Sequence, residues 1–479
     1  MRYADLRGLD PRDYDQPTMS ERLDLALLNP IDSAAMARLD AQLTVNALRY
    51  VRALREGRVV PVAAHAELLI PRQAFDPVPV LEVLRVTSLP DRVLDAIEPQ
   101  FSHYDLLKRA LGRMRSLERD SGLVPLPRPG RVPLRPDSVY LGADRLRRLL
   151  AELGDIPDSA ARMAPEPDTT YDSVLAQGVK RFQRRHGLTA DGVVGWGTLQ
   201  ALNRSFRGRV RQIELSLERW RWLPQGFEVP PIVVNVPAFQ LYALSGTRDD
   251  EAAALVMNVV VGKAFDTDTP AFTSDMTYVV FRPYWEVPMT IAIAEILPKA
   301  LNDTSWIERN EYELVRKGKA IPPTFDNVAA IGTDVRVRQK PGPRNSLGLV
   351  KFMLPNANDV YLHDTPEKSY FSRTRRDLSH GCIRVADPMA LARYVLRDQP
   401  EWTEERILAA MAGEEPVTVP LLRPIPVLIG YATAVATESG DVIFYPDIYQ
   451  LDGELDTLLR QGYPFPTTPR KKPEDITGT

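Results

Sequence analysis

The stretch of sequence that decides the fold reads Ser379-His380-Gly381-Cys382-Ile383-Arg384-Val385. Cys382 is the single cysteine among 479 residues, and His363, one of five histidines, stands nineteen positions before it. In Tyr361-Leu362-His363-Asp364-Thr365, the first and third side chains fall on one face of an expected strand. Cys382 and Arg384 share a face in the same way. The pattern therefore predicts a histidine on one strand facing a thiol on another.

Thiol and imidazole are the groups that nucleophilic acyl chemistry requires, because the imidazole takes the thiol proton and later protonates a leaving group. Lowering the thiol pKa by about two units would raise the rate of nucleophilic attack at neutral pH only about threefold, since a less basic thiolate is also a weaker nucleophile. General acid–base transfer is worth about 10²–10⁴-fold. The sequence thus predicts that proton transfer by His363 matters most. His380 competes for that role, and Gly381 leaves the Cys382 N–H free as an oxyanion donor.

These residues resemble the L,D-transpeptidase (YkuD-type) catalytic domain, in which a histidine precedes Ser/Thr-His-Gly-Cys at a short fixed spacing. Here sixteen positions separate His363 from Ser379. The resemblance implies a thioester between Cys382 and a peptidoglycan stem peptide, with His363 as the base. It also implies that the backbone carbonyl of Asp364 orients the imidazole, and that no cofactor or metal takes part.

Five residues are candidate substrate-binding groups: Arg384, His380, Ser379, Tyr361 and Trp285. Arg384 is suited to hold a substrate carboxylate through two hydrogen bonds, or forms a structural ion pair. Many members of the family carry asparagine at that position. The resemblance gives His380 a supporting part rather than the role of base. Tyr361 and Trp285 are either walls of the cleft or core aromatic residues.

The first half of the chain predicts helical domains. Residues 1–140 carry apolar stripes, including Leu39 to Leu54, and predict a helical scaffold in which Ser20 caps a helix. Residues 141–205 predict a three-helix module with Asp144 as a cap. The runs 182–188 and 191–195 resemble the small peptidoglycan-binding domain. Such a module either binds the wall or only packs against its neighbours.

The second half turns from helix to strand. Residues 206–228 predict a linker helix, in which Trp220 and Trp222 either wedge between domains or stack on a ligand. Residues 229–460 predict the mainly-β catalytic domain, with a capping insertion at about 298–345 and a helix from Asp387-Pro388 through Leu396. Residues 461–479 predict a disordered tail. The predicted fold class is therefore multidomain α+β.

Composition limits the partners. The net charge is -3 with 26% charged residues, so no basic surplus indicates nucleic acid. No apolar run reaches the roughly 18 residues of a membrane span. A lone cysteine excludes an intramolecular disulfide. The N-terminus lacks a signal-peptide core. Because the implied substrate is the cell wall, we expect a periplasmic or wall-facing protein whose signal has been trimmed.

The resemblance thus implies an enzyme that releases D-alanine from a tetrapeptide stem. The acyl group would pass to an amine of a second stem (a 3→3 cross-link), to an outer-membrane or wall-anchored protein, or to a free D-amino acid. With water as the acceptor, the enzyme is an L,D-carboxypeptidase. The resemblance further implies a role in cell shape and acylation by carbapenems. Two rival hypotheses are a zinc site of His363, His380 and Cys382, and a non-catalytic wall-binding protein with an inert thiol.

Overall fold

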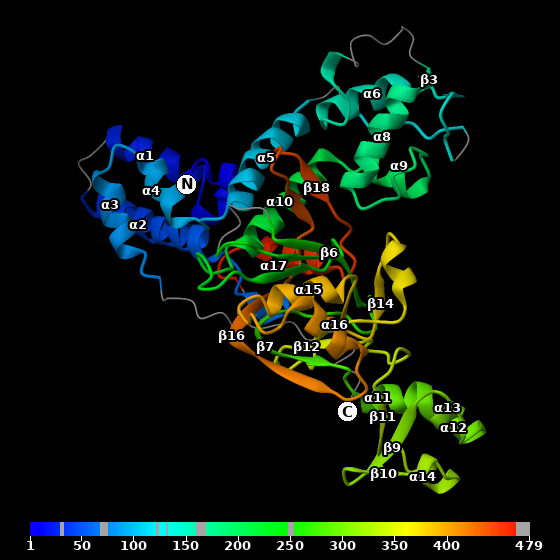
Figure 1. Cartoon of the computed structure of the whole chain (residues 1–479). Helices are drawn as coiled ribbons and strands as arrows, with labels where there is room; N and C mark the ends of the chain where they lie inside the picture. Colours follow the sequence, from blue (N-terminus) through cyan, green and yellow to red (C-terminus); the bar gives the residue numbers. More distant parts are fainter. Residues whose placement is uncertain are drawn as a thin grey trace.

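The computed structural model describes residues 1–28, 33–67, 75–120, 124–130, 133–159, 169–247 and 253–465. A helical N-terminal region and a small helical module lie on one side of a β-rich barrel, and an inserted subdomain projects from the barrel at the other end (Figure 1). This arrangement confirms the predicted α+β class. Within these ranges, no helix combines the length and the apolarity of a membrane span.

The N-terminal region is built on one long helix whose buried stripe includes Leu39, Tyr50 and Leu54. The helix at Ser20 begins earlier than predicted, at Thr18, and the Ser20 hydroxyl donates instead to Gln16 Oε1 at 2.7 Å. The predicted cap is therefore wrong. The elements of this region are η1 (Ala4–Arg7), η2 (Pro11–Tyr14), α1 (Thr18–Leu28), α2 (Ser33–Glu56), η3 (Pro61–Ala64), β1 (Ala66–Glu67), α3 (Val78–Val86), α4 (Pro90–Ile97) and α5 (Ser102–Glu118).

The small module contains β2 (Ser138–Val139), α6 (Ala143–Glu152), β3 (Thr170–Tyr171), α8 (Ser173–Arg185) and α9 (Trp196–Leu202). Its core includes Leu150, Leu175 and Phe182, all fully buried. Asp144 does not cap α6, because the helix begins one residue earlier with Gly142 at the N-cap. A side chain at Gly142 would meet Pro127 at 2.6 Å, so the chain turns there on a glycine.

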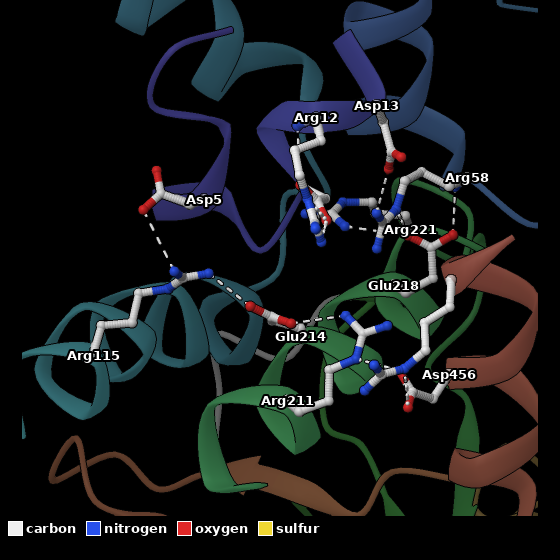
Figure 2. A network of polar contacts seen from close by, with 12 residues as sticks. Asp5, Arg12, Asp13, Arg58, Arg115, Arg211, Glu214, Glu218, Arg221 and Asp456 are labelled. Atoms are coloured by element: carbon white, nitrogen blue, oxygen red, sulfur yellow. Dashed lines mark hydrogen bonds and ion pairs between the residues drawn. The ribbon is translucent and has the colours of Figure 1, made fainter. Parts of the chain in front are cut away.

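Helix α10 (Phe206–Trp220) joins the small module to the barrel and passes through a buried polar network (Figure 2). Glu218, which is fully buried, accepts hydrogen bonds from the backbone N–H groups of Arg58 and Val59 and lies 3.4 Å from the Arg221 guanidinium. Arg221 in turn donates to the carbonyl of Arg7 and to the Tyr104 hydroxyl. Buried charges must be paired, so this network fixes the N-terminal region on α10.

The main sheet has ten strands in the order β1-β7-β12-β13-β15-β6-β5-β4-β16, with β14 beside β6. Because β16 also pairs with β7, the sheet closes into a barrel. The predicted helix after Asp387 is present, and the Asp387 carboxylate accepts from Ala390 N at 2.9 Å. The elements are β4 (Ile232–Asn235), β5 (Gln240–Ala243), β6 (Leu255–Gly262), β7 (Ala271–Phe281), β12 (Val350–Met353), β13 (Leu362–His363), β14 (Asp377–Ser379), β15 (Ile383–Val385), α15 (Pro388–Val395), α16 (Glu404–Ala412) and β16 (Val417–Gly430).

The inserted subdomain, here named the cap, comprises residues 285–345. It contains β8 (Trp285–Glu286), α11 (Met289–Ile291), the π-helix η4 (Ala292–Ile296), α12 (Leu297–Asn302), α13 (Trp306–Arg309), β9 (Tyr312–Arg316), β10 (Lys319–Ile321), α14 (Phe325–Ala329) and β11 (Val335–Gln339). Its sheet has the order β10-β9-β11-β8 and its own apolar core. The cap thus begins at Trp285, before the predicted residue 298.

After the barrel, the chain returns to the N-terminal half. The hairpin β17 (Ala434–Ala436) and β18 (Val442–Phe444) buries its apolar residues in the core of the small module and α5. Gln212 on α10 donates to the carbonyls of Thr433 and Tyr445, both at 2.8 Å. The last helix is α17 (Leu451–Arg460). Of the predicted disordered tail, residues 466–479 lie outside the described residues, while Phe465 packs against a buried cluster.

Candidate active site

Three neighbouring strands of the barrel present the candidate catalytic residues on one face. Strand β13 pairs in parallel with β15, so that His363 lies opposite Arg384, and β12 pairs with β13 so that Lys351 lies opposite His363. Leu362 and Ile383 are fully buried in the barrel core. Because side chains alternate along a strand, their neighbours point away from that core. The structure therefore brings the predicted histidine and arginine together.

The hydrogen bonding of His363 defines which ring nitrogen is free. Its Nδ1–H donates to the backbone carbonyl of Asp364 at 2.5 Å, which leaves Nε2 as the proton acceptor. Burial, and then the positive charges of Arg384 and Lys351, lower the pKa of His363 to about 3. The imidazole is thus neutral at physiological pH. This is the protonation state that a general base needs.

Asp364 is itself held firmly. Its carboxylate accepts a hydrogen bond from Leu349 N at 2.9 Å and pairs with Lys368 Nζ at 2.5 Å. Gly348 has φ +62°, and a Cβ there would lie 2.3 Å from the same carboxylate. Glycine is therefore required for Asp364 to approach the backbone. These contacts fix the carbonyl that orients His363.

Cys382 lies in a turn before β15 rather than on the strand itself, because Gly381 has φ +109° and redirects the chain. The sulfur lies 3.6 Å from the Asp359 carbonyl oxygen. Burial raises the pKa of the Cys382 thiol, and hydrogen bonds from Tyr361 and the charge of Lys351 oppose that rise. Among the described residues, the thiol makes no hydrogen bond to His363. The resting site therefore holds a neutral thiol beside a neutral imidazole.

The loop before Cys382 is held by side-chain hydroxyl groups. Ser379 Oγ donates to the Cys382 carbonyl at 2.6 Å, and Thr269 Oγ1 donates to the Gly381 carbonyl at 2.7 Å. Thr267 Oγ1 donates to the Ser379 carbonyl at 2.9 Å. For the N–H of Cys382, we find no acceptor among the described residues. Ser379 thus contacts the loop, and the Cys382 N–H is available to an oxygen of a ligand.

A cavity of about 410 Å³ lies between the cap and the barrel, lined among others by Trp285, Glu295 and Arg384. The Arg384 guanidinium lies over the Tyr370 ring at 5.5 Å, and its buried Nε has no hydrogen-bond partner. No carboxylate pairs with Arg384 among the described residues. The structural ion pair weighed above for this residue is therefore not seen. Arg384 interacts favourably with Tyr370 and with the charge of Glu367, and a cation without an ion pair that faces a cavity is suited to an anionic ligand.

The His380 side chain contacts the cap. Its Nε2 lies 2.7 Å from Glu295 Oε1 on the cap, and both side chains are about half exposed. The three residues of the zinc alternative, His363, His380 and Cys382, do not form a cluster. In the part of the chain that the structure describes, no group of three or more metal-binding side chains comes together.

Sequence reasoning missed Lys351, Glu295 and Asp359. The ammonium of Lys351 lies 3.9 Å from the centre of the Tyr361 ring and is close enough to the thiol to favour its ionised form. The alternation of Val350-Lys351-Phe352 would have placed Lys351 outside the core. Glu295 could not be found in this way, because its partner is 85 residues away in the chain.

Comparison with known proteins agrees with this geometry. Residues 231–419 match the family model described as the L,D-transpeptidase catalytic domain. The chain contains an L,D-transpeptidase domain. Residues 1–111 match a model described as a scaffold domain, and residues 143–202 match one described as "Putative peptidoglycan binding domain". The resemblance of residues 231–419 and 143–202 to these two domain families, which the sequence suggested, is thereby confirmed.

A protein of Haemophilus influenzae named "Putative L,D-transpeptidase" is 31% identical to this chain over 249 residues. The matched region is 51% of this chain and 49% of that relative. The chain thus spans about half the length of the curated relative that it matches. The similarity supports the class of the L,D-transpeptidase domain, and the substrates and partners of the whole chain are treated below as proposals.

The raised thiol pKa predicts how Cys382 reacts with iodoacetamide. Because the thiolate is the reacting form, a pKa above the ordinary value near 8.5 makes alkylation slow at pH 7. We expect the rate to rise about tenfold per pH unit up to and beyond pH ~8.5. The pH dependence of the alkylation rate is measured on protein treated with a chelator. The reaction is stopped at set times, and the intact mass gives the alkylated fraction. A plateau already reached below pH ~7 would instead indicate a thiolate–imidazolium pair.

Proposed function

We propose that this chain is a cysteine L,D-transpeptidase that acts on peptidoglycan tetrapeptide stems. The observation that carries the proposal is the orientation of His363: its Nδ1–H is bound to the Asp364 carbonyl, which leaves Nε2 free as an acceptor, and Cys382 directly precedes β15, the strand that pairs with β13. Catalytic hydrogen bonds are often long before substrate binds and tighten in the complex, so we expect the Cys382 thiol to reach Nε2 when substrate is bound.

In the proposed reaction, the Cys382 thiol proton moves to His363 Nε2. The sulfur electron pair forms a bond to the carbonyl carbon between the third and fourth residues of the stem. The carbonyl oxygen becomes an oxyanion and accepts a hydrogen bond from the Cys382 N–H. The C–N bond then breaks, and His363 returns the proton to the departing amine of D-alanine. A thioester remains on Cys382.

The second half of the reaction repeats these steps in reverse order. An acceptor amine attacks the thioester carbon, and His363 takes the proton that the amine loses. The C–S bond breaks, and the thiol regains its proton from the imidazolium. The acceptor is a second stem, or the amine of an outer-membrane or wall-anchored protein. Water as acceptor gives the L,D-carboxypeptidase alternative.

We assign Arg384 to the carboxylate of the substrate, because it lines the cavity, its buried Nε has no hydrogen-bond partner, and no ion pair to it is seen among the described residues. The ratio of the alkylation rate with iodoacetate to the rate with iodoacetamide should therefore be higher for Cys382 than for a free thiol. We call this ratio the preference for iodoacetate. Arg384→Gln should lower this preference by roughly 10- to 150-fold, which corresponds to the 1.5–3 kcal/mol of a charge-assisted hydrogen bond. Alkylation rates read by intact mass measure the preference.

Arg373→Gln is the matched control for that experiment. Arg373 lies over the same Tyr370 ring, at 4.9 Å, but it is exposed and does not line the cavity. Its loss should leave the preference for iodoacetate unchanged. An equal preference in wild type and Arg384→Gln would remove Arg384 from the substrate site.

The proposal places the protein in the periplasm or facing the wall. The match of residues 143–202 to a peptidoglycan-binding domain supports peptidoglycan as its partner. The test is incubation with defined muropeptides, with product masses as the readout. Loss of one D-alanine with joining of two stems supports transpeptidation, and loss with addition of water supports the carboxypeptidase. Unchanged muropeptides together with a thiol that iodoacetamide does not alkylate would support the non-catalytic alternative.

A further inference from the structure

One contact joins the cap to the loop that carries the nucleophile. His380 Nε2–H donates to the carboxylate of Glu295 at 2.7 Å. His380 stands two residues before Cys382, and Glu295 belongs to the cap. A carboxylate accepts this hydrogen bond whether the imidazole is neutral or charged. The contact therefore spans the opening between the two parts.

The backbone around Glu295 has an unusual form. Residues Ala292–Ile296 make a π-helix between α11 and α12, and such turns are frequent at functional sites. The turn places Glu295 on the wall of the cavity while its neighbours Ala292 and Ile296 are buried in the core of the cap. The position of Glu295 is therefore coupled to the position of the packed core of the cap.

The two chain connections of the cap lie together at another point. Asn345, which is fully buried, donates from Nδ2 to the Pro283 carbonyl at 3.1 Å and to the Lys340 carbonyl at 2.9 Å. Pro283 precedes the cap and Asn345 ends it. This arrangement makes a fixed base for the cap at its chain connections. The Glu295–His380 contact is formed away from that base, by residues that neither connection contains.

We propose that Glu295 is a positioning residue that holds the cap closed on the nucleophile loop through His380, and so limits the access of water to the thioester on Cys382. The inference rests on the proposed function, because it concerns the choice between an amine and water as acceptor. Glu295 does not touch the reacting atoms in this account. It acts on the reaction through the position of the cap.

The test compares wild type with Glu295→Ala in two measurements. Exposed ion pairs contribute up to about 1 kcal/mol, so the variant should show a threefold to fivefold higher ratio of hydrolysis to transfer on a defined muropeptide. Amide hydrogen exchange in residues 289–302 should rise by a similar factor in the protein alone. Glu295→Gln keeps an oxygen acceptor for His380 and should show a smaller change.

Two controls make the test specific. Glu308→Ala removes an exposed carboxylate elsewhere on the cap and should alter neither measurement. The double variant Glu295→Ala/His380→Ala should exchange no faster than Glu295→Ala alone, since both remove one contact. Unchanged exchange in Glu295→Ala, or additive effects in the double variant, would overturn the inference. If no muropeptide is turned over, the proposed function fails, and the exchange measurement still decides whether the contact closes the cap.

Discussion

Replacing Cys382 with alanine is expected to lower acyl transfer by at least about 10³-fold, because removal of a nucleophile eliminates the covalent route. No other cysteine exists in the chain to replace it. The variant should still bind muropeptides, since Arg384 and the cavity are unchanged. The measurement is the rate of D-alanine release from a defined tetrapeptide stem, followed by mass.

The matched control for this variant is Ser379→Ala. Ser379 is buried and braces the carbonyl of Cys382, so its loss should reduce the rate without abolishing the thioester. Trapping the thioester by intact mass separates the two variants: Ser379→Ala should accumulate it, and Cys382→Ala should not. A Cys382→Ala protein that keeps even a tenth of the wild-type rate would contradict the nucleophile assignment.

Replacing Glu218 with alanine is expected to lower the free energy of unfolding of the N-terminal region by about 3–5 kcal/mol, because it leaves the buried Arg221 guanidinium without its carboxylate partner. Glu218 and Arg221 are both fully buried, and Arg58 lies beside them (Figure 2). The carboxylate also accepts from two backbone N–H groups. The measurement is the urea dependence of hydrogen exchange in peptides covering residues 50–64 and 206–222.

Two further variants define the origin of that loss. Glu218→Gln keeps an acceptor for the backbone and removes only the charge, so its effect should be intermediate. Glu118→Ala removes an exposed carboxylate from the end of α5 and should change stability by less than about 0.5 kcal/mol. An equal stability of Glu218→Ala and wild type would show that the network does not hold the N-terminal region on α10.

The part of the site that lies close together in the chain could be predicted from the sequence. Strand alternation predicted His363 and Arg384 on strands, and β13 and β15 do pair with these two residues opposite each other. The helix after Asp387 followed from a local cap and a proline. In contrast, the exact place of Cys382 in a turn depends on the backbone of Gly381, which periodicity does not reveal.

The parts that depend on distant pairings could not be predicted. Lys351 enters the site through the register of β12 with β13, and Glu295 enters it through the fold of the cap. No local pattern encodes either pairing. The return of the β17–β18 hairpin to the N-terminal half depends on contacts such as that of Gln212 with Thr433, which are 221 residues apart.

The position of the β17–β18 hairpin affects how the protein folds during its synthesis. The small module and α5 complete their core only when Ala434 and Phe444 are in place. During synthesis these residues emerge long after the small module and α5. Until then, the apolar surface that they cover in the folded protein stays exposed. Exposed apolar surface of this kind promotes aggregation. Newly made chains should therefore depend on holding chaperones until the last strands arrive.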